Sequence, residues 1–411
     1  MSKNKENNTS TKLSAGLVPK LRFPEFEKTE EWELMQIGSI LNGESSSLAL
    51  NKLDLKKSGY AVYGADSIIG YIDTFQHKNQ YISIVKDGSG VGRLNLCESE
   101  TSTLGTLSAL KSKDEKKYQI EWAYYLLNTI DFSSYVKGSG IPHIYYSDYK
   151  SQNIGVPKPN EQQKIAACLS SLDEVITAES QKLVLLKDHK KGLLQNLLPQ
   201  AGETVPKFRF KEFEDSGEWE VTELSELGYL INGLTYSPED VRHKGLLVLR
   251  SSNIQDGLID LKDCVYVRED INGANQTKPK DILVCVRNGS KNLIGKNAII
   301  PEGIPFATHG AFMTVFRANN PAFVFQLFQS EYHDKQVRAD LGATINSING
   351  RNLIKYEFPV PKKTKEQDKI ANTLSSVDDL IKAQIEKVEA LQQHKKGLLQ
   401  GLFPNVNEVT E

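Results

Sequence analysis

The sequence predicts an α+β protein in which two similar modules are separated by two long helices that pair as an antiparallel coiled coil, giving a pseudo-two-fold internal repeat. Two observations carry this prediction. Residues 161–199 and 366–404 are identical at 22 of 39 positions without a gap. A second matching pair stands upstream, VPKLRF at 18–23 and VPKFRF at 205–210. The segments that lie between these matching pairs are less similar to each other. We therefore expect one duplicated scaffold that carries two diverged modules.

The composition is that of a globular protein. Hydrophobic residues make up 39% and charged residues 25% of a chain of 411 residues, which is long enough for two domains. No apolar run approaches the roughly 20 residues that a membrane helix needs. The polar residues 1–17 are expected to form a disordered tail rather than a signal peptide. Four widely spaced cysteines predict reduced thiols in a cytoplasmic protein, not a zinc site or a disulfide framework: Cys97, Cys168, Cys264 and Cys285.

Prolines mark where the two long helices begin and end. Proline is tolerated at helix boundaries and disfavoured inside helices, so VPKP at 156–159 and VPKK at 360–363 indicate the starts. Pro199 and Pro404 indicate the ends. The expected domains after the tail are a first module over 18–157, a first spacer helix over 158–200, a second module over 201–361, a second spacer helix over 362–404 and a C-terminal tail over 405–411.

Apolar residues follow alternating steps of four and three along both helices, which is typical of a coiled-coil seam. The seam of the first helix consists of Ile165, Leu169, Leu172, Ile176, Leu183, Leu186, Leu193 and Leu197. That of the second consists of Ile370, Leu374, Val377, Ile381, Val388, Leu391, Leu398 and Leu402. Both are interrupted at equivalent places, by Glu179 and Lys190 and by Gln384 and Lys395. The alternative is two amphipathic helices, each packed only on its own module.

An antiparallel pairing would bring the midpoints of the two helices together. Glu179 and Gln384 would then meet, and the carboxylate could accept a hydrogen bond from the amide. At about 1.5 Å per residue, the 38 residues 161–198 span about 57 Å, the length of roughly 17 base pairs. A rod of this length would hold the two modules at opposite ends.

The modules alternate short strands with turns and look like diverged copies of one fold. YISIVKDGS at 81–89 and DILVCVRNGS at 281–290 each read as an apolar strand, a basic residue and a glycine turn, so the two basic residues are expected to be equivalent. Short helices are expected near 121–127 and 322–327. Both modules close with a Gly-x-x-Ile-x-x-Ile pattern that begins at Gly138 and at Gly342.

Three segments approach enzyme motifs without completing them. NPAF at 320–323 has alanine where the amino-methyltransferase box has proline, and no glycine-rich cofactor loop accompanies it. GSGVG at 88–92 precedes a strand pattern, whereas a dinucleotide loop opens a helix. The Gly295-Lys296 pair lacks the first glycine and the hydroxyl residue of a phosphate-binding loop. The seven histidines form no cluster, and the sequence therefore predicts a protein without a catalytic or metal site.

With these motifs in place, the chain resembles the specificity subunit of type I restriction–modification systems over nearly its whole length. The resemblance rests on the order and duplication of PKLRF and PKFRF, of Trp32-Glu and Trp219-Glu, of EQQKI at 161–165 and EQDKI at 366–370, and of the HKKGLLQ that closes both helices. It implies two target-recognition domains, each of which reads one half of a split sequence in double-stranded DNA. It also implies two modification subunits that methylate adenine with S-adenosylmethionine, and restriction subunits that translocate and cleave with ATP and Mg²⁺. No cofactor is expected in this chain, and no membrane partner.

Residues that could contact DNA are polar or basic side chains on the glycine turns and closing segments, because bases are read through hydrogen bonds to their edges. In the first module they are Lys86, Ser89, Arg93, His143 and Tyr145. In the second they are Arg250, Ser252, Asn253, Arg287, Asn288, Ser290, Lys291, Asn346 and Asn349. Each of them could instead be a solvated turn residue. Arg250 and Arg287 stand out because each ends an apolar strand and arginine can bind guanine bidentately.

Two other functions remain open from the sequence: an autonomous, repressor-like DNA-binding protein and a coiled-coil adaptor for proteins. The net charge of −2 disfavours the first, since a protein that binds DNA alone neutralises many phosphates. Residues 241–358 are only modestly basic, with 15 Lys or Arg against 11 Asp or Glu. The second would leave the paired strand–turn loops without a role.

Overall fold

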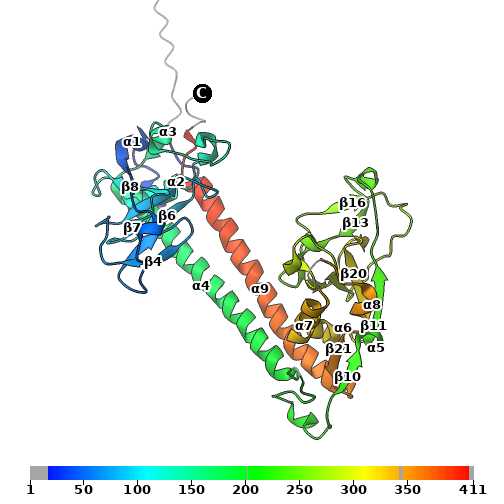
Figure 1. Cartoon of the computed structure of the whole chain (residues 1–411). Helices are drawn as coiled ribbons and strands as arrows, with labels where there is room; N and C mark the ends of the chain where they lie inside the picture. The colour runs from blue at the N-terminus through cyan, green and yellow to red at the C-terminus, as the bar shows by residue number, and fades with distance from the viewer. Residues whose placement is uncertain (1–16, 201, 342–345, 407–411) are drawn as a thin grey trace, which may run out of the picture. The chain divides into compact units, whose positions relative to one another are not determined.

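The computed structural model describes residues 17–200, 202–341 and 346–406 (Figure 1). The predicted tails at 1–17 and 405–411 lie almost wholly outside this range, and so do Gly342 and Ile345 of the second closing pattern. The chain divides into two compact units: unit 1 consists of residues 1–180 and 387–411, and unit 2 of residues 181–386. Each long helix contributes one half to each unit. The domain boundaries predicted from the sequence treat the helices as separate segments, and they stay a prediction.

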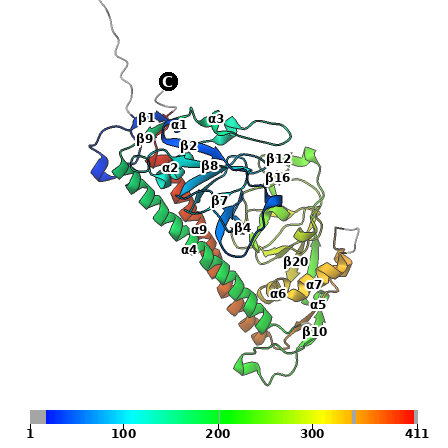
Figure 2. The same ribbon diagram turned by 60° about the vertical axis from the view of Figure 1, so that its left-hand side comes forward.

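The described residues of unit 1 form three small sheets. One pairs β1 (Glu33–Gln36) with β9 (Asn153–Val156). The largest has the order β2-β8-β5-β6, with bounds Leu41–Ser45, Leu107–Ser112, Tyr81–Val85 and Leu94–Cys97. The third has the order β4-β3-β7, with bounds Ile68–Ile72, Tyr60–Tyr63 and Ser102–Thr103. Helices α1 (Ile37–Ile40), α2 (Ile120–Leu127) and α3 (Tyr146–Tyr149) complete the module (Figure 2).

Unit 2 repeats this plan with additions. It pairs β10 (Glu220–Glu223) with β21 (Glu357–Val360) and β14 (Ile254–Gln255) with β15 (Leu258–Ile259). A four-stranded sheet has the order β11-β20-β17-β18, with bounds Gly228–Asn232, Met313–Ala318, Ile282–Cys285 and Asn297–Ile299. Another has the order β12-β16-β13-β19, with bounds Val241–Arg242, Val265–Val267, Leu246–Leu249 and Ala307–His309. The helices are α5 (Leu224–Leu227), α6 (Pro321–Phe328), α7 (Glu331–Asp340) and α8 (Gly350–Leu353).

The two modules are copies of one fold, as the sequence predicts. The central sheets match strand for strand, since β2-β8-β5-β6 corresponds to β11-β20-β17-β18. The second sheets share an unusual feature, because β3 pairs in parallel with β7 and β13 pairs in parallel with β19. α2 and α6 follow the equivalent strands β8 and β20 along the chain. Helix α7 distinguishes unit 2, where it follows α6 directly.

The long helices are α4 (Pro159–Leu197) and α9 (Thr364–Leu402), and within each unit their halves lie side by side (Figures 1 and 2). The first turns of both also pack into a module core. Ile165 and Leu169 of α4 lie in the core of unit 1 with Leu402 of α9. Ile370 and Leu374 of α9 lie in the core of unit 2 with the end of α4. The helices therefore pack both on their modules and on each other.

Ion pairs fix the direction of the pairing as antiparallel. In unit 1, Lys395 binds Asp173 at 2.5 Å, and Lys387, nearer the start of α9, binds Glu179, farther along α4, at 2.5 Å. In unit 2, Lys190 binds Asp378 at 2.6 Å. The position on α9 falls as the position on α4 rises, which confirms the predicted antiparallel coiled coil.

The lysines that interrupt the seam have equivalent tasks in the two units. Lys395 lies over the ring of Tyr125, and the Tyr125 hydroxyl donates to Asp173 at 2.8 Å. Lys190 lies over the ring of Phe325 in the same way. Each lysine thereby ties the two long helices to a helix of the module. The predicted contact between Glu179 and Gln384 joins residues of different units and stays a prediction.

Candidate nucleic-acid interface

In unit 1 the glycine turn after β5 and the closing segment before α3 form one surface. The Ile144 amide donates to the Lys86 carbonyl at 2.8 Å, which holds the two segments side by side. Lys86 Nζ lies 5.8 Å from the centroid of the Tyr145 ring, and the rings of His143 and Tyr145 are 5.3 Å apart. Three of the five residues predicted for this module therefore lie together. Tyr145 is the most exposed of them, at 46%.

The other two predicted residues of unit 1 lie on the turn itself. Ser89 is exposed and follows Gly88, whose φ of +99° strongly favours glycine. Arg93 is exposed and forms an ion pair with Asp66. Arg93 therefore has a partner within the protein, whereas Ser89 presents its hydroxyl at the tip of the turn.

The closing segment of unit 1 is anchored by Asp148. Its carboxylate accepts from Lys137 Nζ at 2.7 Å and from the Tyr145 amide at 2.9 Å. These two donors, Lys137 first, hold the pKa of Asp148 below its usual range. Tyr145 is thus positioned by a carboxylate that stays ionised at neutral pH.

In unit 2 the turn after β17 meets three other segments. The guanidinium carbon of Arg287 lies 5.6 Å from the centroid of the Phe312 ring, in the loop before β20. Asn288 Nδ2 donates to Ser251 Oγ at 3.0 Å, which joins the turn to the segment after β13. Arg287 also forms a β-bridge with Ser347 of the closing segment. Arg287 and Phe312 are both exposed on the resulting surface.

The three residues predicted after β13 have different environments. Arg250 binds Asp263 at 2.7 Å and is one-third exposed. Ser252 is exposed. Asn253 is fully buried, and its amide donates to the carbonyls of Asp260 and Asp263. Burial leaves Asn253 no free amide for a base, so its side chain shapes the loop, and we do not assign it to the DNA interface.

The remaining predicted residues of unit 2 frame the turn. Asn346 Nδ2 donates to the Gly289 carbonyl at 3.0 Å, and Asn349 Oδ1 accepts from the Arg351 amide as the N-cap of α8. Both asparagine side chains therefore hold local structure while part of each stays accessible. Ser290 and Lys291 are exposed at the end of the turn.

The strand register corrects one expectation from the sequence, the equivalence of Lys86 and Arg287. Val85 pairs with Leu107 in β8, and Cys285 pairs with Met313 in β20. Counting onward, Arg287 corresponds to Asp87, and Lys86 corresponds to an apolar residue, Val286. Both strands are apolar throughout and lack the alternation of polar and apolar residues that would fix their alignment. The alignment of the two sequences is therefore wrong by one residue at this turn.

Sequence reasoning did not identify Phe312 as part of the interface. Its side chain is 57% exposed although it is large and apolar. Apolar residues beside a strand are ordinarily expected in the core, and nothing in the local pattern marks this one as exposed. The sequence feature that could have indicated its exposure is its position between the loop that contains Gly310 and the start of β20.

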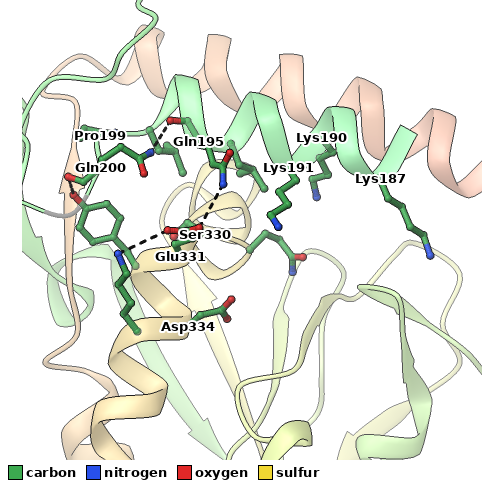
Figure 3. Close-up of a pocket in the computed structure, with 14 residues that line it drawn as sticks. Lys187, Lys190, Lys191, Gln195, Pro199, Gln200, Ser330, Glu331 and Asp334 are labelled. Atoms are coloured by element: carbon green, nitrogen blue, oxygen red, sulfur yellow. Dashed lines mark hydrogen bonds and ion pairs between the residues drawn. The ribbon is translucent and has the colours of Figure 1, made fainter. Parts of the chain in front are cut away.

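Unit 2 also contains a cleft of about 280 Å³ (Figure 3). It lies between the C-terminal end of α4, which supplies Lys187, Lys190 and Lys191, and the start of α7, which supplies Glu331 and Asp334. Most of these charges already have partners: Lys187 binds Asp256, Lys190 binds Asp378, and Glu331 lies 3.7 Å from Lys335. The cleft therefore has the character of a polar groove between packed helices.

One of the segments that approach enzyme motifs, NPAF at 320–323, has a structural role. Asn320 caps α6, because its Oδ1 accepts from the Phe323 amide, and its Nδ2 donates to Asp368.

Among the described residues, no group of three His, Cys, Asp or Glu side chains could hold a metal ion. The four cysteines are free thiols, and burial raises the pKa of Cys97 and of Cys285. No helix in the described part of the chain is long and apolar enough to cross a membrane.

A protein-family model, related sequences and a solved structure all match this chain, and all three indicate the same kind of protein. A model of the type I restriction modification DNA specificity domain matches residues 29–188 and again residues 216–390. The MjaVIII type I restriction enzyme specificity subunit of Methanocaldococcus jannaschii is 26% identical over 394 residues, covering 90% of this chain and 91% of that protein. The EcoKI specificity subunit of Escherichia coli is 28% identical over 197 residues, covering 44% and 42%.

A solved structure shares the fold over most of the chain. It is the crystal structure of the S subunit of a type I restriction–modification system from M. genitalium, with a TM-score of 0.63 and 17% identity. The alignment covers 94% of this chain and 99% of that one. The duplicated architecture described above is therefore also that of the solved S subunit.

Proposed function

The chain belongs to the family of type I restriction–modification DNA specificity subunits, and from this membership we propose that each of its two modules reads one half of a bipartite DNA sequence. The family match makes the chain a specificity subunit rather than a repressor-like protein or a protein-only adaptor. The observation that best supports two half-sites is that one fold occurs twice with different side chains on equivalent turns, as at Asp87 and Arg287.

The proposed reading surface of unit 1 is the turn at 86–90 with the closing segment at 143–145. Ser89, His143 and Tyr145 offer hydrogen-bonding groups, and Lys86 and Arg93 add positive charge near the phosphates. The proposed surface of unit 2 uses Arg287 and Asn288 of the turn, with Arg250 and Ser252 beside them. Ser290, Lys291, Asn346 and Asn349 form its border.

The long helices are proposed to set the distance between the half-sites. Each is 39 residues long, which corresponds to about 58 Å at 1.5 Å per residue. Ion pairs and apolar seam residues stabilise the helix pair in both units. A coiled coil held in this way resists bending more than a flexible linker does, which is the property that a fixed spacer requires.

The same helices are proposed to dock two modification subunits. Three positions of the HKKGLLQ segments hold the same residue in both copies and are exposed in both. Packing does not explain why these residues are the same, because exposed side chains are not needed for the core. The three equivalent pairs are His189 and His394, Lys191 and Lys396, and Gln195 and Gln400. Identical surfaces repeated in the two halves of a chain suit two copies of one partner. We place the methylation of adenine by S-adenosylmethionine in those subunits, and translocation and cleavage with ATP and Mg²⁺ in restriction subunits.

The experiment that tests this function is to purify the chain with its modification subunits and map the sites that the complex methylates in random-sequence DNA. The expected result is one motif in two specified parts separated by unspecified bases. The lone chain should bind the same DNA weakly, because its net charge of −2 supplies little attraction for phosphates. A single continuous motif would contradict the proposal.

A further inference from the structure

The equivalent turns of the two modules carry opposite charges at one position. The amides of Lys86 and Asp87 both donate to the Thr106 carbonyl, at 2.9 and 3.3 Å. In unit 2 the amides of Val286 and Arg287 both donate to the Phe312 carbonyl, at 3.0 and 3.1 Å. This shared bifurcated pattern places Asp87 and Arg287 at the same point of the same fold.

A second contact supports the equivalence independently. Asp87 forms a β-bridge with His143 of the first closing segment, and Arg287 forms one with Ser347 of the second. Each bridge lies next to a closing-segment isoleucine, Ile144 or Ile348, whose amide donates to the residue before the bridge at 2.8 Å. The two side chains therefore leave the backbone at corresponding places on corresponding surfaces.

The surroundings of Arg287 favour contact with a ligand. It is exposed, and no carboxylate pairs with it among the described residues. Its guanidinium instead lies over the exposed ring of Phe312, a contact that orients the group without using its N–H donors. An oriented guanidinium with free donors matches the O6 and N7 acceptors of guanine in the major groove.

Asp87 offers the reverse chemistry. Its carboxylate binds Lys86 Nζ at 3.0 Å through Oδ2 and is about one-third exposed. A carboxylate accepts several hydrogen bonds, so Oδ1 remains for a donor. Among base edges in the major groove, the amino group of cytosine is the donor that an acidic side chain accepts from.

We propose that positions 87 and 287 are equivalent specificity-determining positions, at which Arg287 selects a guanine in the half-site of unit 2 and Asp87 selects a cytosine in the half-site of unit 1. This inference rests on the proposed function that each module reads one half-site. Phe312 acts as a positioning residue for Arg287. The equivalent residue of unit 1 is the exposed Thr106, which cannot stack on a guanidinium.

The test uses the complex of the full chain with its modification subunits, and sequences both the DNA that it binds and the DNA that it methylates from a random library. Arg287→Gln should lower the preference for guanine at one position of one half-site by about tenfold or more, since a bidentate contact discriminates by that order. Asp87→Asn should alter one position of the other half-site only. Arg338→Gln, which changes an exposed arginine of α7, is the matched control and should leave the motif unchanged.

Three outcomes separate the possibilities. Loss at a single position in the expected half-site supports the inference, and Phe312→Leu should then give a smaller loss at that same position. Equal weakening for all sequences would mean that Arg287 contacts phosphate, and would overturn the inference while leaving the bipartite motif intact. Absence of a bipartite motif with the unsubstituted chain would instead overturn the proposed function itself.

Discussion

The guanidinium of Arg22 binds both carboxylate oxygens of Glu161, with Nε–Oε1 and Nη2–Oε2 distances of 2.8 Å. Trp32 Nε1 donates to the same carboxylate at 3.2 Å. The frame of unit 2 repeats this arrangement atom for atom, with Arg209 and Trp219 on Glu366. The carboxylate lies in the first turn of a long helix, where the helix dipole favours negative charge. In each unit, the motif upstream of the module supplies the arginine and the tryptophan, and the start of the long helix supplies the glutamate. We call this buried Arg–Glu–Trp arrangement the clamp; it occurs once in each unit.

The first prediction concerns this clamp. Glu161 and Arg22 are almost fully buried, and the carboxylate raises the pKa of Arg22, so the guanidinium stays charged. Glu161→Gln keeps an oxygen for Trp32 but leaves that charge uncompensated, and should lower the free energy of unfolding by about 3 kcal/mol. Urea denaturation of the whole chain measures the loss. Glu174→Gln, an exposed change on the same helix, should stay within about 0.5 kcal/mol; equal effects would show that the clamp adds nothing.

The second prediction concerns the antiparallel register. Lys395→Glu places a carboxylate against Asp173 and should destabilise unit 1 by about 1 kcal/mol or more. Adding Asp173→Lys should restore most of that loss by re-forming the pair with its charges exchanged. Lys396→Glu, at an exposed neighbouring position, is the control for adding an acid to this helix. Thermal unfolding of the four proteins checks the result, and a double variant no better than the single one would refute the pairing.

The third prediction is a pH dependence of the closing segment in unit 1. The pKa of Asp148 is depressed in the folded protein, so the stability that it contributes is present above the usual aspartate pKa of about 3.9. That contribution is lost as pH falls through the lower, folded value. Hydrogen exchange of residues 143–150 should therefore be several-fold faster in Asp148→Asn than in the native chain at pH 6, and the ratio should fall toward one as the pH is lowered through the folded pKa of Asp148. Asp188→Asn, an exposed change on α4, should show a ratio of one throughout.

The fourth prediction concerns the repeated exposed residues. If each HKKGLLQ segment docks one modification subunit, Lys191→Glu and Lys396→Glu should each reduce the complex from two such subunits to one. The double variant should lose both while the chain itself stays folded, because both lysines are exposed. Native mass spectrometry of the co-purified complex gives the stoichiometry. Two subunits retained by the double variant would place docking elsewhere.

The duplication in the sequence sufficed to predict much of the fold. It located the helices, the antiparallel seam and its interruptions at Lys190 and Lys395, because identical spacing survives in both copies. Their partners Asp173 and Asp378 were not identified, since both lie off the apolar pattern from which the seam was traced. The clamp was visible only as motifs, because nothing in a linear spacing says that residues 139 positions apart meet.

The reading surfaces were harder to predict, and for different physical reasons. Nothing in the sequence distinguishes Asn253 from an exposed asparagine. Only the fold shows that its side-chain amide donates to two backbone carbonyl groups. Phe312 looks like a core residue until its exposure is known. The equivalence of Arg287 with Asp87 depends on strand pairing, which a fully apolar strand does not encode.

The measurement that tests the central claim most directly is the methylation motif of a complex whose spacer helices have been lengthened. Four residues inserted at matching positions of α4 and α9 add about 6 Å, close to two base pairs. The account predicts that both specified halves of the motif stay the same while the unspecified spacer between them grows. A motif with an unchanged spacer, from a complex that still methylates DNA, would contradict it.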